Sequence, residues 1–204
     1  MGWAHVTATI IFGYLCGSIP FSFLVARMHG VDLRQVGSGN TGASNVWRTI
    51  GFANFVAALA LDIIKGFVPT AIAYYLLHFA PLPTILVGLA AVIGHVYPIF
   101  LGFRGGKAVA TTSGVVLAIQ PLLWLLGAIT WTTIYKLSGY ASVASLGTLI
   151  IGAVVSAVMA LSGMLTTTFA LFIWISMAVV VYLHRGNIER LVHGTENRIG
   201  PRTK

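Results

Sequence analysis

Long uncharged stretches of apolar residues are the feature of this sequence that most restricts its fold. Residues 3–26 contain no Asp, Glu, Lys or Arg, and they are numerous enough to cross a hydrocarbon core of about 30 Å as a helix. The composition agrees, because 57% of the residues are hydrophobic and 8% are charged, whereas a soluble domain carries about 25% charged residues. We therefore predict an all-α integral membrane protein, with residues 1–204 forming a single domain.

Basic residues outnumber acidic ones, and their positions predict the orientation of the chain. Lys and Arg total 12 against 4 Asp and Glu, which gives a formal net charge of +8. Membrane proteins concentrate Lys and Arg in cytoplasmic loops, so this charge indicates a cytoplasmic face and no nucleic-acid partner. Arg27 and Arg34 follow the first apolar run directly, which predicts an external N-terminus. The basic residues after residue 183 predict a cytoplasmic C-terminus.

The apolar runs predict a compact bundle of about seven hydrophobic helices, some of which span only half of the membrane. Pro20 interrupts the first run and predicts a kink, because proline lacks a backbone N–H. Gln120 and Pro121 interrupt residues 108–134, which predicts either a segment that enters and returns or a half helix paired with a full one. The remaining crossings are expected over residues 86–101, 141–161 and 165–183.

The second apolar run contains a charged pair, Asp62 and Lys65. Residues three apart share a helical face, so opposite charges there can pair. This pattern is consistent with a structural ion pair or, alternatively, with a carboxylate that orients a basic group of a site. Because the charges interrupt the run, we expect residues 46–61 to form a short or half-inserted helix and residues 65–79 to be the true crossing.

Three polar segments separate the apolar runs, and we define them as residues 37–48, 94–111 and 184–191. The first combines glycines, hydroxyls and amides. Its backbone N–H groups can form an anion-binding concavity, since glycine permits the required conformations. Asn45 and Arg48 can share a helical face and direct their donors at one anion. These features predict a site that binds a phosphate group.

The second and third polar segments favour anions as well. Gly105, Gly106 and Lys107 precede an apolar helix, so that backbone N–H groups, a helix N-terminus and an ammonium surround one point. His184 and Asn187 are three residues apart and can present an imidazole and an amide to one ligand.

Two further polar residues have alternative interpretations. His95 is either a hydrogen-bonded core histidine or a ligand-contacting one, and a lone histidine predicts no metal site. Ser145, at the start of the run 141–161, is either a local partner of the backbone or a substrate contact.

Together, the three polar segments resemble the signature motifs of the bacterial acyl-phosphate:glycerol-3-phosphate acyltransferases, the PlsY family. The resemblance covers nearly the whole chain. It implies a multi-pass enzyme of the bacterial inner membrane, in phospholipid biosynthesis, with its active site facing the cytoplasm. The implied reaction transfers a fatty acyl group from a long-chain acyl phosphate to the sn-1 hydroxyl of glycerol 3-phosphate, giving lysophosphatidic acid and phosphate. No cofactor or metal is expected, membrane lipid is the surrounding partner, and a monomer carries the complete motif set.

This resemblance suggests a division of the site between two phosphates. The residues expected around glycerol 3-phosphate are Ser38, Arg48, Lys107, His184 and Asn187. The residues expected around acyl phosphate are Asn40, Thr41, Gly42, Gly105 and Gly106. Asn45, His95 and Ser145 complete the predicted site, with Lys107, His184, Asn187 and Ser145 nearest to the chemistry.

An acyl phosphate is a mixed anhydride with a good leaving group, so the reaction needs no covalent enzyme nucleophile. The hydroxyl proton can go to His184 as a general base or to the leaving phosphate, and basic neighbours such as Arg185 favour the phosphate. Two other functions stay open at this point. The spacing of His184 and Glu189 is reminiscent of thioester-dependent acyltransferases, and basic residues at membrane depth also occur in carriers of organic phosphates.

Overall fold

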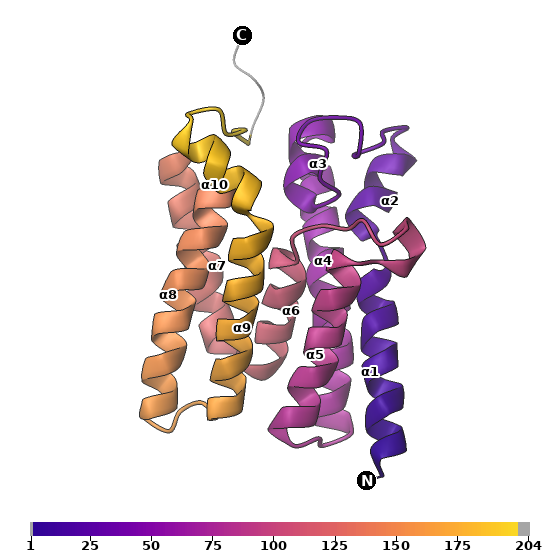
Figure 1. Ribbon diagram of the computed structural model, residues 1–204, viewed down its shortest axis with the longest axis vertical. Helices are drawn as coiled ribbons and strands as arrows, with labels where there is room; N and C mark the ends of the chain where they lie inside the picture. Colours follow the sequence, from indigo (N-terminus) through magenta and orange to yellow (C-terminus); the bar gives the residue numbers. More distant parts are fainter. Residues whose placement is uncertain (1, 200–204) are drawn as a thin grey trace.

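The computed structural model describes residues 2–199, so residue 1 and residues 200–204 of the predicted domain lie outside that range. Over the described residues the chain is helical, and its helices form a bundle (Figure 1). The α-helices are α1 (Trp3–Ser18), α2 (Phe21–Met28), α3 (Ala43–Ile50), α4 (Phe52–Ala71), α5 (Pro81–Val96), α6 (Val109–Ile119), α7 (Pro121–Ser138), α8 (Ala141–Leu161), α9 (Thr167–Leu183) and α10 (Arg185–Val192), with the π-helix η1 (Ile72–Leu76) and the 3-10 helix η2 (Ile99–Leu101).

Four helical units are long and apolar enough to cross a membrane, by length and composition. These units are Trp3–Met28, Phe52–Leu76, Pro81–Leu101 and Ala141–Leu161. The pair α9 and α10, bent by 57°, adds a fifth if it is counted as one span. Because α6 is a shorter apolar helix, the predicted all-α bundle with incomplete spans is confirmed.

The break between α1 and α2 confirms the predicted kink. The first helix ends at Ser18, and the second begins after Pro20. The Lys65 ammonium donates a hydrogen bond to the Ile19 carbonyl at 2.8 Å. That bond satisfies a backbone oxygen at the break, which is required because no water is present in the hydrocarbon region.

The prediction of a half-inserted helix over residues 46–61 is wrong. The short helix α3 ends before Gly51, and α4 then continues without interruption past Asp62 and Lys65. The two charges lie 2.9 Å apart, with 2% and 3% of their side chains exposed. Since Ser22 also donates to Asp62 at 2.6 Å, the charges are neutralised inside the bundle and do not end the helix.

The predicted division of residues 108–134 is confirmed. Helix α6 ends at Ile119, Gln120 adopts an extended conformation with φ −151°, and Pro121 begins α7. Proline at the first helical position is favoured, because its missing N–H has no intrahelical partner there. The short helix α6 therefore begins within the second polar segment, at Val109, and ends at Ile119.

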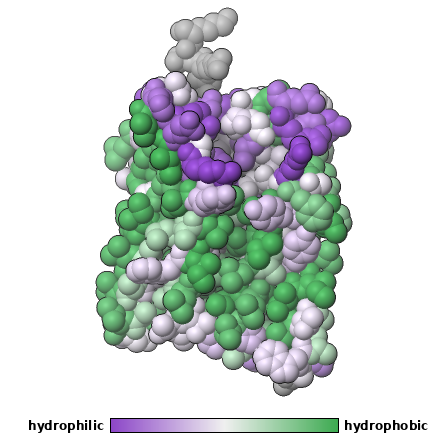
Figure 2. All heavy atoms as spheres, viewed as in Figure 1, coloured by the Kyte–Doolittle hydropathy of each residue, from purple (hydrophilic) through white to green (hydrophobic). Residues whose placement is uncertain are grey.

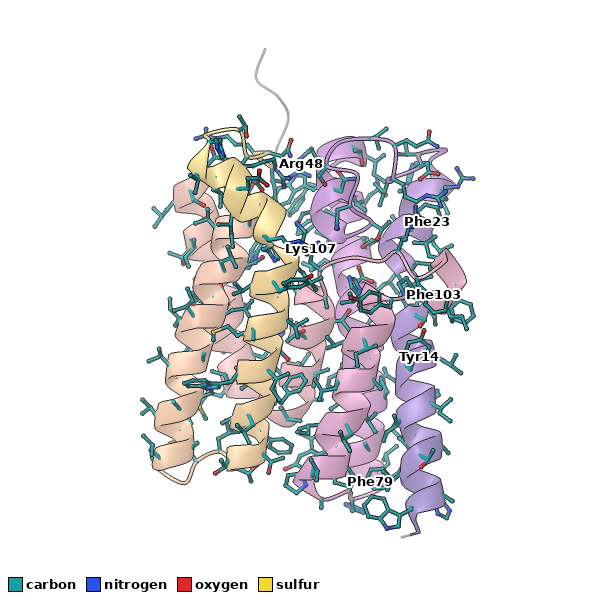
Figure 3. The ribbon with its side chains drawn as sticks, in the orientation of Figure 1. Tyr14, Phe23, Arg48, Phe79, Phe103 and Lys107 are labelled. Atoms are coloured by element: carbon teal, nitrogen blue, oxygen red, sulfur yellow. The ribbon has the colours of Figure 1, made fainter. Side chains whose placement is uncertain are left out.

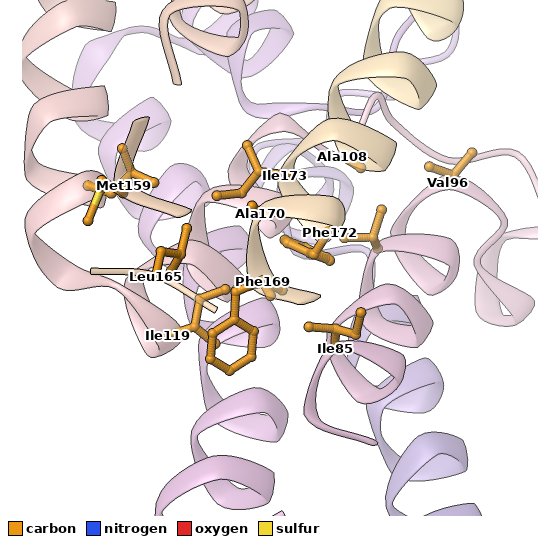
Figure 4. Packing of buried hydrophobic residues seen from close by; sticks show 13 residues of the cluster. Ile85, Val96, Ala108, Ile119, Met159, Leu165, Phe169, Ala170, Phe172 and Ile173 are labelled. Atoms are coloured by element: carbon orange, nitrogen blue, oxygen red, sulfur yellow. The ribbon is translucent and has the colours of Figure 1, made fainter. Parts of the chain in front are cut away.

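The packing of α6 places the second polar segment against the other helices. A Cβ at Gly66 would collide with the Thr111 carbonyl, and one at Gly114 would collide with the Ile63 carbonyl. Glycine thus permits the close approach of α4 and α6, as is common between helices in membranes. On the other side of α6, buried side chains of α5 and α9, including Phe169, form the largest hydrophobic cluster (Figure 4).

The bundle has one markedly hydrophilic end. Hydrophilic residues gather where α3 and α10 lie, and apolar side chains cover the flanks (Figure 2). The first residues of α1 lie at the opposite end of the bundle (Figure 1). The first and third polar segments therefore lie at the hydrophilic end, and the second lies between the two ends of the bundle, on the side of the hydrophilic end (Figure 1).

Candidate active site

A cavity of about 620 Å³ lies between α3, α4 and α6 on one side and α7 and α8 on the other. Its hydrophilic end contains Arg48 and Lys107, which Figure 3 shows between the two sides of the bundle. The cavity brings together most of the predicted site residues, namely Ser38, Asn40, Gly42, Asn45, Arg48, His95, Lys107, Ser145, His184 and Asn187.

Three predicted residues lie outside this cavity. Thr41, Gly105 and Gly106 line a separate small space of about 10 Å³, together with Asp62 and His95. That volume corresponds to about one water molecule. These three residues therefore lie behind the wall of the main cavity.

Asn45 organises the first polar segment. Its side-chain amide donates to the carbonyls of Leu33, Val36 and Asn40 at 3.0–3.1 Å. Its side-chain oxygen accepts a hydrogen bond from the Ser38 N–H at 3.0 Å. The expectation that Asn45 directs donors at an anion is therefore wrong, because both of its N–H groups hold the loop that carries Ser38.

Arg48 lies on α3 and faces the C-terminal strap, a name we give to residues 195–199. Its guanidinium donates to the carbonyls of Asn197 and Arg198 at 3.3 and 3.2 Å. Burial lowers the pKa of Arg48. Among residues 2–199 its hydrogen-bond acceptors are neutral oxygens, including Asn45 Oδ1 at 3.4 Å, and it forms no ion pair. The guanidinium thus retains an uncompensated positive charge.

Lys107 approaches the third polar segment. Its ammonium donates to the side-chain oxygen of Asn187, whose amide donates to Glu196 at 2.6 Å. The pKa of Lys107 is lowered to about 8, mainly by burial, with Glu196 opposing the shift and with Arg190 and Arg48 contributing to it. The cavity therefore contains a lysine that is charged at neutral pH and whose pKa depends on the charged groups around it.

Ala108 holds an unusual conformation directly after Lys107. Its φ of 59° lies in the left-handed region, and it precedes the first residue of α6. Residues other than glycine seldom adopt this region, and such strain occurs where the surrounding structure imposes it. The turn directs the chain from the Lys107 loop into α6.

His184 lies at the corner between α9 and α10. Its Nδ1 lies 2.8 Å from the Val180 carbonyl, and the side chain is buried. Because a carbonyl only accepts hydrogen bonds, Nδ1 carries the proton and Nε2 presents a lone pair. Glu189 is exposed on α10, so the spacing of these two residues does not create a catalytic pair.

Glu196 joins these candidate residues, although no motif predicted it. Its buried carboxylate accepts hydrogen bonds from Ser142 at 2.9 Å, from Asn187 at 2.6 Å and from Arg190 at 2.8 Å. The residue belongs to the strap, which has no helical periodicity. Its only sequence signal was that it is one of few acidic residues in a basic chain.

The second polar segment uses its backbone N–H groups internally. Gly105 donates to the Val96 carbonyl at 3.0 Å, and Gly106 donates to the His95 carbonyl at 3.2 Å. The expectation that these two amides surround a ligand is therefore not met. The His95 ring is buried, and its Nδ1 lies 3.1 Å from the Thr111 hydroxyl. These contacts fit the interpretation of His95 as a hydrogen-bonded core histidine.

Ser145 lines the cavity from α8 and accepts a hydrogen bond from the indole N–H of Trp131 at 3.1 Å. The charged groups that meet at this end are the cations Arg48, Lys107 and Arg190 and the single carboxylate of Glu196. Among residues 2–199, no three His, Cys, Asp or Glu side chains gather as metal ligands. The arrangement is suited to holding anionic groups.

Comparison with known proteins identifies the family. Residues 7–194 match the family model for glycerol-3-phosphate acyltransferase. The chain belongs to this family. A glycerol-3-phosphate acyltransferase of Roseiflexus sp. (strain RS-1) is 51% identical over 191 residues, covering 94% of each chain. The glycerol-3-phosphate acyltransferase of Aquifex aeolicus (strain VF5) is 43% identical, covering 93% of this chain and 96% of that one.

Two crystal structures of a glycerol-3-phosphate acyltransferase have the same fold. They describe PlsY (YgiH), an integral membrane glycerol 3-phosphate acyltransferase, in its glycerol 3-phosphate form and in its lysophosphatidic acid form. The TM-scores are 0.88 and 0.85, with 39% and 37% identity and 96% coverage of each chain. The acyltransferase fold, with its membrane-embedded helices, is therefore shared by this chain.

Proposed function

We propose that this acyltransferase moves a fatty acyl group from a long-chain acyl phosphate to the sn-1 hydroxyl of glycerol 3-phosphate. The products are lysophosphatidic acid and phosphate. One observation carries the proposal, namely that a single cavity joins a cationic end containing Arg48 and Lys107 to a long apolar region. The related PlsY structures, with glycerol 3-phosphate and with lysophosphatidic acid, support this assignment.

The apolar region has the dimensions of a fatty chain. Along α7 the cavity is lined from Lys136 to Leu123, a distance of about 20 Å at 1.5 Å per helical residue. One leaflet of a bilayer, about half of the 30 Å hydrocarbon core, holds an extended acyl chain. Leu59, Val116 and Trp124 contribute to the apolar lining. This region therefore accommodates the acyl group of the donor.

Glycerol 3-phosphate is assigned to the cationic end. Ser38, Arg48, Lys107, His184 and Asn187 would contact it, since all five line the cavity there. Hydrogen bonds between charged donors and phosphate oxygens are stronger than those to neutral carbonyls. Phosphate would therefore replace the strap carbonyls as the partner of Arg48.

The donor phosphate is assigned to Asn40, Gly42 and the start of α6. Because Gly105 and Gly106 use their amides within the loop, the free N–H groups of Val109 and Ala110 in the first turn of α6 are the better donors. The N-terminus of a helix attracts anions through its dipole and its unsatisfied N–H groups. This assignment places the acyl carbonyl near the junction of the polar and apolar regions.

Transfer then needs no covalent intermediate on the enzyme. The sn-1 oxygen forms an ester bond to the acyl carbon, and the bond from that carbon to the phosphate oxygen breaks. The leaving phosphate accepts the hydroxyl proton, while His184 and Asn187 position the hydroxyl. A protonated His184 would add a positive charge beside Lys107, which disfavours its use as a base.

We also propose that the hydrophilic end faces the cytoplasm of a bacterium, in its inner membrane, with the N-terminus outside. Basic residues such as Arg27, Arg34 and Arg185 support this orientation. We propose that a monomer is active, because the residues assigned to both substrates come from one chain.

A donor comparison tests the reaction. The purified protein is given glycerol 3-phosphate with palmitoyl phosphate, palmitoyl-CoA or palmitoyl acyl carrier protein, and lysophosphatidic acid is measured. We expect product from palmitoyl phosphate. Product only from a thioester would contradict the proposed donor. Uptake of glycerol 3-phosphate into protein-containing liposomes, without conversion, would instead indicate a carrier.

A further inference from the structure

The cavity is bordered by α4 and α7, which share α6 as a packing partner and otherwise pack against different helices. Helix α7 packs mainly against α6 and α8, whereas α4 packs against α1, α2, α3, α5 and α6. Both α4 and α7 line the cavity with apolar side chains. Val56 on α4 and Leu126 on α7 are 46% and 40% exposed, so apolar surface is accessible on both borders. In a membrane-spanning bundle, such exposed apolar surface is in contact with lipid chains.

An aromatic cluster joins the two borders at the hydrophilic end. The rings of Trp47 and Tyr135 have their centroids 5.2 Å apart. Trp47 also stacks on Phe55 at 4.6 Å and contacts Phe52 at 4.8 Å, which ties it to α4. Tyr135 lies on α7 and stacks on Trp131 of the same helix, with ring centroids 5.4 Å apart. The contact between Trp47 and Tyr135 therefore connects the α3 and α4 side to the α7 side.

This contact adjoins the cationic end of the cavity. Trp47 directly precedes Arg48 in α3, and both residues line the cavity. On the opposite side, Trp131 is held in place by its hydrogen bond to Ser145. The cluster thus adjoins Arg48 in the sequence of α3 and links α3 and α4 to α7 beside the cavity.

We infer that the contact between Trp47 and Tyr135 is a gate between the bilayer and the site. The inference rests on the proposed function. The acyl phosphate enters sideways, its chain passing between α4 and α7 and its phosphate passing the two rings. Lysophosphatidic acid leaves by the same route.

Two features favour this route over access from water. The C-terminal strap, through Asn197 and Arg198, lies against Arg48 at the hydrophilic end. A long acyl chain passing there would have to leave the bilayer, whereas glycerol 3-phosphate is hydrophilic and small. The Trp47–Tyr135 pair contributes about 0.5–1.5 kcal/mol beyond its buried area. Trp131, which packs on the cluster of α3 and α4, stacks on Tyr135 and separates with it, so the opening moves α7 side chains and unfolds no helix.

A reversible crosslink tests the gate. In a Cys16→Ser background, Trp47→Cys and Tyr135→Cys are joined with a disulfide-containing bismaleimide, which leaves the two sides linked until a reductant is added. With the crosslink in place, turnover of palmitoyl phosphate is expected to fall at least about tenfold. Turnover of butyryl phosphate, which is water-soluble and reaches the site with glycerol 3-phosphate, is expected to change less than about twofold. Reduction is expected to restore palmitoyl transfer.

The controls separate the gate from general damage. Each single-cysteine variant is treated with the same reagent, as is a Leu137→Cys variant, whose side chain is exposed on α7. Each of these proteins is compared with the same variant before treatment, and we expect the reagent to leave its ratio of palmitoyl to butyryl turnover unchanged. If the double variant does not fold, Tyr135→Ala replaces it, and removal of the ring is expected to increase the turnover of palmitoyl phosphate relative to butyryl phosphate.

Three results would overturn the inference. Full palmitoyl turnover with a complete crosslink would show that the chain does not pass between these residues. Equal loss with both donors would show that the contact limits no step specific to the long chain, which contradicts the gate. In the fallback variant, an unchanged ratio of the two donors would exclude the gate. No product from the parent protein with either donor would instead contradict the proposed function.

Discussion

Two charged regions of this membrane protein differ in how their charges are neutralised. In the first, Asp62 and Lys65 pair at 2.9 Å, Asp62 accepts a hydrogen bond from Ser22, and Lys65 donates one to the Ile19 carbonyl. In the second, the cations at the hydrophilic end of the cavity share one carboxylate, that of Glu196. The first region is compensated within the protein, whereas the second has an excess of positive charge.

We interpret the Asp62 and Lys65 region as structural and propose the cationic end of the cavity as the anion-binding region. Ionisable groups are costly in a membrane unless they are paired or reach a polar cavity. Asp62 and Lys65 are paired with each other, and Lys65 also donates a hydrogen bond to the Ile19 carbonyl at the break after α1. Arg48 and Lys107 meet this requirement only partly, through neutral oxygens of the strap and Asn187. Anionic substrates would complete their compensation.

The largest expected effect is on stability. Asp62→Ala leaves the Lys65 ammonium buried without its carboxylate, which typically costs about 3–5 kcal/mol of unfolding free energy. We expect a clearly lower midpoint of thermal unfolding in detergent. The double variant Asp62→Ala, Lys65→Met removes both charges and should recover most of the loss. An unchanged midpoint in Asp62→Ala would contradict the structural role of the pair.

The next effect is on turnover. Lys107→Ala and Arg48→Ala each remove a charged donor from the anion site, so acyl transfer should fall at least about a hundredfold. Both proteins should remain folded, because neither residue belongs to the Asp62 pair. Arg104→Ala, a change at an exposed cation outside the cavity, serves as the control. Activity close to that of the parent in either site variant would refute the assignment.

A smaller effect is expected at Glu196. Glu196→Ala removes the acceptor that holds the Asn187 amide, and a hydrogen bond to a charged group contributes about 1.5–3 kcal/mol. We expect kcat to fall about tenfold, with no rise in KM for glycerol 3-phosphate, because a negative charge leaves the anion site. Glu196→Gln keeps a neutral acceptor and should lose less. A rise in KM alone would contradict this positioning role.

The smallest effect is a dependence on pH. Burial lowers the pKa of Lys107 to about 8, so its ammonium is present below that pH and is lost above it. A phosphate monoester has its second pKa near 6, so the dianion meets a charged lysine between about pH 6 and 8. KM for glycerol 3-phosphate should rise severalfold between about pH 7 and 9. Lys107→Arg keeps its charge, so a similar rise in that variant would assign the effect to another group.

Local signals in the sequence predicted much of the fold. Pro20 and Pro121 marked the two helix breaks, because proline affects the backbone wherever it occurs. The charges at Asp62 and Lys65 were misleading, since their partners Ser22 and Ile19 are distant in the sequence. Whether a buried charge interrupts a helix depends on such tertiary partners.

The composition of the candidate site was also predictable, but the use of individual groups was not. The residue types of the three polar segments indicated anion binding, and most of their residues line one cavity. Asn45 and Gly106 instead donate to backbone carbonyls, because loops in a compact fold must satisfy their own polar groups. Glu196 lies in an irregular strap, where no periodicity indicates which side chain is buried.

The most direct test of the central claim is phosphate release by the purified protein in detergent or lipidic mesophase. Palmitoyl phosphate is supplied with and without glycerol 3-phosphate, and phosphate and lysophosphatidic acid are measured together. The proposed reaction predicts release that requires both substrates, with one lysophosphatidic acid formed for each phosphate. Release without glycerol 3-phosphate, or no release with both substrates present, would contradict acyl transfer between two substrates in one cationic cavity.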